Sequence, residues 1–353
     1  MKRLALTLMV VFMTNAALAQ KLAYRLHFQT YFDNLESSDP WEGTRTLFAV
    51  KLSPEIGLQL GHGHSFMIGA HLMQDLGDTL LTKAQPTIYY RYQGKRFNAL
   101  AGSFPRRYSI SDYPLTFFDR DWCFYNNNIN GMMLQYVNRR HTGHVEFFVD
   151  WQGQSQKFRI DEFMIVGSTQ YAFFDRLLII DAAALLSHFK NDYVLDDSFL
   201  LERAYYNVAL STDLHKIVPR LDHLKLGFGT LSSMEHKRYL DIDSKWQHKI
   251  GFQAEGDVQW KWIGLKNTFY FGDRQQTFYQ QYGKRIYSGS PFYQSKRYNR
   301  TNLYGIWSKK FLSIRGDIIL HATQGYLANQ QMLTLSLNLH QMFVKGKLRN
   351  VKY

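Results

Sequence analysis

Serine and histidine stand side by side at two places in the chain of 353 residues, and such pairs are the first to test for catalysis. Ser187 and His188 are adjacent, so in a strand they would point to opposite faces and could not form a nucleophile–base hydrogen bond. The sequence HGHS at residues 62–65 has two imidazoles that could share a metal, but a glycine-rich turn with solvated imidazoles explains it better. The sequence has no phosphate-binding loop, zinc-ligand spacing or nucleophile elbow. We therefore expect no enzyme, no cofactor and no metal site.

Segment 105–128, PRRYSISDYPLTFFDRDWCFYNNN, concentrates charges of both signs. They are Arg106, Arg107 and Arg120 against Asp112, Asp119 and Asp121. In a narrow aqueous passage, opposed charges of this kind create a transverse field that discriminates solutes by charge. An ordinary external loop with solvated charges is the alternative. The aromatic residues of the segment favour packing against another part of the chain, and we expect its Cys123, the single cysteine, to be a passive thiol.

The composition excludes several classes of protein. With 26 Phe, 23 Tyr and 7 Trp the chain can bury enough apolar surface to fold, so it is not disordered. One cysteine cannot form a disulfide within the chain. Beyond the first twenty residues no stretch approaches the ~18 uninterrupted apolar residues of a spanning helix. The net charge of +13 is dispersed and includes no basic helix, which argues against a nucleic-acid partner.

Residues 1–19, MKRLALTLMVVFMTNAALA, have the three parts of a secretory signal peptide. Lys2 and Arg3 form the basic part, an apolar stretch follows, and Ala17-Leu18-Ala19 is a small-x-small cleavage site. We expect cleavage after Ala19 and export of the remaining chain. A retained N-terminal anchor is the alternative.

Apolar and polar residues alternate in about sixteen segments of the remaining chain. The clearest is near the end, where four leucines alternate with polar residues: Leu333, Leu335, Leu337 and Leu339 against Thr334, Ser336, Asn338 and His340. Since successive side chains of a strand point to opposite faces, each such segment predicts a strand with one apolar and one polar face. We therefore expect an all-β protein.

A soluble β-sandwich and a transmembrane barrel can both use this pattern. Three features favour an antiparallel up-and-down membrane barrel of about 16 strands (14–18). Charges occur at mid-strand positions such as Glu255 and Arg315, aromatic residues gather at segment ends, and the segments outnumber those of one sandwich. Connections also alternate between short and long, as in outer-membrane barrels, where closure satisfies every backbone group.

A cleaved signal, about sixteen alternating strands, the long connection 105–128 and an alternating last strand together resemble the porins of Gram-negative outer membranes. The resemblance implies a barrel over residues 20–343 and a lumen narrowed by residues 105–128. A homotrimer is one option that it leaves open. The chain differs from porins in its end, where VKGKLRNVKY follows Phe343. Residues 344–353 are then either a basic tail or the end of a longer last strand.

From this resemblance we expect a passive outer-membrane channel for small hydrophilic solutes. The basic excess among its inward-facing residues predicts a mild preference for anions, and the positive net charge predicts attraction to the lipopolysaccharide of the surrounding membrane. The expected pore-lining residues are Arg25, His27, Lys51, Glu55, Arg91, Lys225, Glu255, Asp257, Lys266, Arg315, Asp317 and His321. A non-conducting accessory or binding barrel is the first alternative. A barrel hydrolase is the second, and it would need catalytic side chains that meet across strands.

Overall fold

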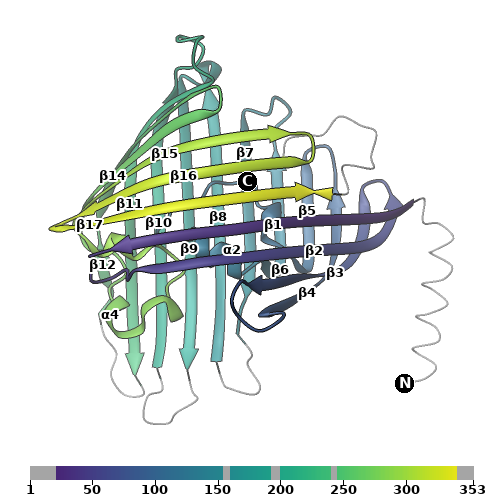
Figure 1. The fold of residues 1–353 in the computed structure, drawn as a ribbon, viewed down its shortest axis with the longest axis horizontal. Helices are drawn as coiled ribbons and strands as arrows, with labels where there is room; N and C mark the ends of the chain where they lie inside the picture. The colour runs from purple at the N-terminus through teal and green to yellow at the C-terminus, as the bar shows by residue number, and fades with distance from the viewer. Residues whose placement is uncertain (1–20, 154–159, 192–198, 240–244, 340–353) are drawn as a thin grey trace.

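A computed structural model describes residues 21–153, 160–191, 199–239 and 245–339. These residues form one antiparallel sheet in which strands adjacent in sequence pair and the first strand closes on the last (Figure 1). β1 (Lys21–Ser37) pairs with β17 (Tyr326–Asn338), with Thr30 opposite Leu335. The expected sixteen-strand barrel is confirmed. Seventeen segments fill sixteen positions because β12 (Gln247–Lys249) and β13 (Gly251–Trp260) both pair with β11 (His223–Tyr239).

Twelve further strands complete the sheet of the described residues. They are β2 (Arg45–Gly61), β3 (His64–Asp75), β4 (Lys83–Gln93), β5 (Phe97–Pro105), β6 (Asn128–Val137), β7 (Gly143–Trp151), β8 (Ile160–Phe173), β9 (Leu178–Asn191), β10 (Phe199–Asp213), β14 (Ile263–Gly272), β15 (Arg297–Lys309) and β16 (Leu312–Thr323). The expected signal peptide and the residues 344–353 lie outside the described residues. Among the described residues no helix has the length and apolar character to cross a membrane.

Alternate residues of the strands face lipid and lumen. On β9, Leu186 is 51% exposed on the outside, whereas its neighbour Leu185 is buried inside. On β17, Leu333 is exposed and Met332 is buried. Such an apolar outer face meets hydrocarbon, and barrel closure leaves no unpaired edge within it.

The two ends of the barrel differ in their connections. One end has short turns, such as those at 62–63, 94–96 and 310–311. The other end has the long loops 106–127 and 273–296. Outer-membrane barrels place short turns in the periplasm and long loops outside, which orients the molecule.

Both long loops fold into the barrel and pack together there. Asp119 N donates to Ser288 O at 2.7 Å, and Ser290 N donates to Leu115 O at 2.7 Å. A Cβ on Gly289 would lie 1.9 Å from Thr116 O, so only glycine permits this approach. Aromatic residues of the loops join side chains of the inner wall in one buried cluster: Phe117, Phe118, Tyr279, Tyr287, Phe292 and Tyr293. The external half of the lumen is therefore packed with loop residues.

The wall varies in height around the barrel. β5, β6 and β7 have only 9, 10 and 9 residues, whereas β8 to β11 have 14 to 17. At ~3.3 Å per residue, the longer strands rise beyond the hydrocarbon region on the external side. Side chains at their external ends can thus meet the headgroups of outer-leaflet lipids.

The lipid-facing assignment predicts the cost of a charge on β10. Val208 is 51% exposed on the outer face, six residues from Glu202 and five from the periplasmic end of the strand. We expect Val208→Arg to destabilise the barrel by about 2–4 kcal/mol, since the guanidinium would lie near the bilayer midplane. Leu80→Arg, in the external connection 76–82 where Leu80 is 93% exposed, is the matched control and should change little. Urea unfolding in lipid vesicles measures both, and equal stability of the two variants would contradict the membrane orientation.

Candidate functional site

Ionisable side chains form a row on the lipid-facing side of β9, β10 and β11. In register, Glu202 of β10 lies opposite His188 of β9 and opposite His236 of β11. We call these three residues the His–Glu–His row. Leu201 and Arg203, the neighbours of Glu202 along the strand, are buried in the lumen, so Glu202 points outward. The barrel thus brings together residues that are 48 positions apart in the sequence.

The geometry of the row suits proton transfer. His236 Nδ1 and Glu202 Oε2 are 3.2 Å apart. A carboxylate only accepts hydrogen bonds, so Nδ1 is the donor and Nε2 is the ring nitrogen that can take up a proton. The side chain of Glu202 is 36% exposed, whereas that of His236 is 5% exposed. The row therefore has a partly exposed carboxylate that polarises a well-held imidazole.

Aromatic rings extend the row on both sides. Trp246 stacks on His236 with ring centroids 4.9 Å apart. Phe163 of β8 stacks on His188 at 4.9 Å, and Trp151 of β7 stacks on Phe163 at 5.2 Å. Aromatic belts of this kind mark the membrane interface of a barrel. The His–Glu–His row thus lies where headgroups and acyl chains of a lipid meet.

Two exposed cations lie two residues beyond the row, toward the external end of the strands. Lys190 and Arg238 are the register partners of Leu200, which is two residues before Glu202 on β10. Two residues of a strand span about 6.7 Å. A phosphate bound by these cations would therefore hold the linkages below it close to the His–Glu–His row.

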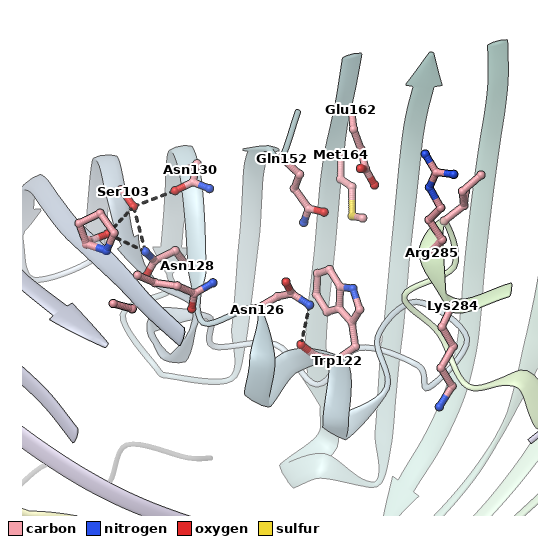
Figure 2. A pocket seen from close by; sticks show the side chains of 14 residues that line it. Ser103, Trp122, Asn126, Asn128, Asn130, Gln152, Glu162, Met164, Lys284 and Arg285 are labelled. Carbon is pink, nitrogen blue, oxygen red and sulfur yellow. Dashed lines mark hydrogen bonds between the residues drawn. The ribbon is translucent and has the colours of Figure 1, made fainter. Parts of the chain in front are cut away.

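A polar cleft of about 550 Å³ lies between residues of the short strands β5 and β6, the strand β8 and the two long loops (Figure 2). It is lined from the outer face by Ser103 and Asn130, and from the lumen by Glu162 and the loop residues Lys284 and Arg285. Ser103 Oγ donates to Asn130 Oδ1 at 2.7 Å and accepts from Asn128 Nδ2 at 3.0 Å. Its lining thus combines side chains from both faces of the wall.

Two serine–histidine pairs face the lumen. Ser53 Oγ lies 2.7 Å from His71 Nδ1, and these residues are 0% and 2% exposed. Ser111 Oγ lies 3.1 Å from His144 Nε2. Ser187 and His188 point to opposite faces, as the alternation requires: Ser187 accepts from Arg203 inside, and His188 stacks on Phe163 outside. Within the described residues no group of three potential ligands could hold a metal ion.

The residues expected to form a constriction lie in the loop packed inside the barrel, where most of them bind fixed partners. Arg106 pairs with Asp150, and Arg107 pairs with Glu55 at 2.9 Å. Arg120 lies 3.3 Å from Asp317, and Asp121 lies 3.3 Å from both Arg45 and Lys284. Asp119 caps α2 (Arg120–Tyr125), and Asp112 is exposed. These charges hold the loop in the lumen.

The expected lining residues also have partners inside the barrel. Arg25 and Arg91 lie against the ring of Tyr108. Three residues form hydrogen bonds: Lys51 with Asn127, Asp257 with Tyr304, and His321 with Tyr298. Three ion pairs involve the others: Lys225–Asp181, Glu255–Lys266 and Arg315–Asp317. His27 is buried opposite Ser53 in the register of β1 and β2. They thus form a connected polar wall.

Comparison with known proteins decides the family. A family model described as lipid A 3'-O-deacylase-type matches residues 14–346. The chain belongs to this family. No curated protein sequence matches it. Among solved structures, a loop-deletion variant of OmpT, an outer-membrane protein of Vibrio cholerae, is similar with a TM-score of 0.54 and 8% identity, over 90% of this chain and 99% of that one.

Porins share the fold at similarly low identity. A porin variant of Rh. blastica has a TM-score of 0.51 and 7% identity, covering 90% of this chain and all of its own. OprB of Pseudomonas putida has a TM-score of 0.51 and 9% identity, covering 90% and 94%. These similarities show the fold, an outer-membrane β-barrel.

Family membership corrects two expectations. The passive channel is wrong, and so is the absence of an enzyme, because the family is named for a deacylase of lipid A. The resemblance to porins holds for the fold alone. Wall side chains alone cannot fill a barrel of sixteen strands, but in this protein two loops pack inside it. Lipopolysaccharide was expected only as part of the surrounding membrane, but this family is named for an enzyme that acts on its lipid A.

Sequence reasoning missed the His–Glu–His row because its members lie on three strands with no local motif. A signal was present, however. Residues 188, 202 and 236 are ionisable side chains at outward positions of strands, and such positions otherwise carry apolar residues such as Leu186 and Val208. Ionisable residues on the lipid face are costly and deserve a functional explanation.

The loop charges provide a test of the packed lumen. Burial raises the pKa of Asp119 to about 7, and the charge of Asp121 adds to the rise. Lys284 and Arg45 hold the pKa of Asp121 below its usual range despite burial. A carboxyl whose pKa is raised by folding destabilises the folded state increasingly as pH rises from about 4 to about 7.

We therefore expect Asp119→Asn to stabilise the barrel by about 1–2 kcal/mol at pH 8 and to have little effect at pH 4. The amide oxygen can still accept the Arg120 N–H that Asp119 Oδ1 accepts at 2.8 Å. Thermal unfolding at both pH values measures the difference. A variant less stable than the parent at pH 8 would show that the charged form is required.

Proposed function

We propose that this protein hydrolyses an acyl ester of lipid A in the outer leaflet of the outer membrane. The observation that carries the proposal is the family match over residues 14–346. The His–Glu–His row supports it, since it brings a hydrogen-bonded carboxylate and imidazole to the lipid-facing surface at the aromatic belt. Acyl esters of a membrane lipid lie at this depth, between headgroup and hydrocarbon.

The row can act as a general base on water. His236 Nε2 accepts a proton from water while the water oxygen attacks the ester carbonyl carbon. Glu202 accepts from Nδ1 and stabilises the imidazolium that forms. The proton then passes to the sugar oxygen as the carbon–oxygen bond breaks, which yields a fatty acid and a free hydroxyl. Lys190 and Arg238 bind a phosphate of the headgroup and so position the ester.

Removal of either group of the pair should impair hydrolysis. We expect Glu202→Gln and His236→Gln each to lower acyl release at least about 100-fold, the usual contribution of a general base. Mass spectrometry of lipid A incubated with the full-length protein in detergent measures the loss of an acyl chain. Glu36→Gln, an exposed carboxylate near the external end of β1, is the matched control and should keep the parent activity.

Two results would contradict this proposal at different levels. If the parent protein released no acyl chain from lipid A, the activity itself would be wrong. If the parent were active and both variants equally so, the activity would stand and the catalytic row would be wrong.

The buried Ser53–His71 pair is the second candidate for the reaction, because it is a hydrogen-bonded nucleophile and base at 2.7 Å. It is enclosed in the lumen, so an ester in the bilayer does not reach it. We expect Ser53→Ala to keep at least about half of the parent activity in the same assay. A loss of 100-fold or more in this variant would move the reaction into the barrel.

A further inference from the structure

The periplasmic end of the barrel contains a second cleft, of about 800 Å³, on the opposite side of the membrane from the His–Glu–His row. The turn between β4 and β5 contributes Lys95 and Arg96 to its lining. The turn between β6 and β7 contributes Arg139 and His141, and Arg25 of β1 lines its interior. Its volume is in the range of small-molecule sites.

The charge of this cleft has one sign. Its lining includes four residues with permanent positive charge and no carboxylate. Among the ion pairs formed by described residues, none involves Lys95, Arg96 or Arg139. A concave surface with charges of one sign concentrates the field and attracts counter-ions. The remaining polar lining, including Gln59, Ser65 and Asn138, adds neutral hydrogen-bonding groups.

Further arginine side chains lie at the inner end of the cleft, around the ring of Tyr108. The guanidinium carbons of Arg25, Arg91 and Arg107 lie 5.5, 4.5 and 5.8 Å from the centre of the Tyr108 ring. Arg107 is neutralised by Glu55 at 2.9 Å. Arg91 is the register partner of Ser65 in the lining, and its Nε is buried without a hydrogen-bond partner among the described residues. The inner end of the cleft thus keeps a positive excess.

We propose that this periplasmic cleft binds a phosphate-bearing anion. Arginine side chains offer paired donors that match phosphate oxygens, and lysine adds a compact charge. Arg96 and Arg139 lie on neighbouring turns at the mouth, where they can hold one phosphate between them, while Arg25 attracts charge from within. The phosphate could belong to a phospholipid headgroup of the inner leaflet or to a soluble phosphorylated compound. The site is independent of the proposed acyl hydrolysis.

Calorimetric titration of the full-length protein in a neutral detergent with inorganic pyrophosphate tests the soluble source. Binding to nanodiscs with phosphatidylglycerol, compared with phosphatidylcholine alone, tests the headgroup. We expect binding of at least one of these probes, weakened by added salt. The double variant Arg96→Gln/Arg139→Gln should bind it about tenfold more weakly. Arg220→Gln, an exposed arginine on the periplasmic connection 214–222, should bind as the parent does.

The variants allow a clear decision. Thermal unfolding first verifies that the double variant is folded, as expected for two exposed turn residues. Pyrophosphate binding lost in the double variant supports a soluble ligand, and loss of phosphatidylglycerol preference alone supports a headgroup. The proposal is overturned if neither probe binds, or if the double variant and Arg220→Gln bind as the parent does.

Discussion

Backbone hydrogen bonding within hydrocarbon is the constraint on which the rest of this structure depends. A spanning strand with unpaired N–H and C=O groups would cost several kcal/mol for each group, so the sheet must close on itself. The pairing of β1 with β17 provides that closure. Once the sheet is closed, every residue of a strand faces either lipid or lumen, and strand register decides which side chains are neighbours around the barrel.

Closure with sixteen positions creates an interior that wall side chains alone do not fill. In this protein the loops 106–127 and 273–296 occupy it. Their contacts combine backbone hydrogen bonds between the loops, a shared aromatic cluster and ion pairs such as Arg107–Glu55. Arg106 and Arg107, two of the charged residues that suggested a selective passage, form ion pairs with the wall residues Asp150 and Glu55.

The same constraint explains the position of the proposed chemistry. Long strands β8 to β11 carry the sheet beyond the hydrocarbon, and their outer face at that height tolerates ionisable side chains. His188, Glu202 and His236 meet there by register, with cations above them and aromatic rings beside them. At the periplasmic end, by contrast, basic residues gather at the turns between shorter strands. The two ends therefore present basic side chains to different leaflets and compartments.

The alternation of apolar and polar residues determined by itself that the chain forms a barrel of about sixteen strands, because side-chain direction in a strand has a period of two. It did not determine the strand limits, and the last strand, β17, runs from Tyr326 to Asn338. It could not reveal that the loops pack the lumen, because that depends on contacts such as Gly289 against Thr116 between distant segments. Nor could it reveal the His–Glu–His row. The 3.2 Å contact between Glu202 and His236 exists because the register of β10 and β11 places them opposite each other, and register is a property of the closed sheet.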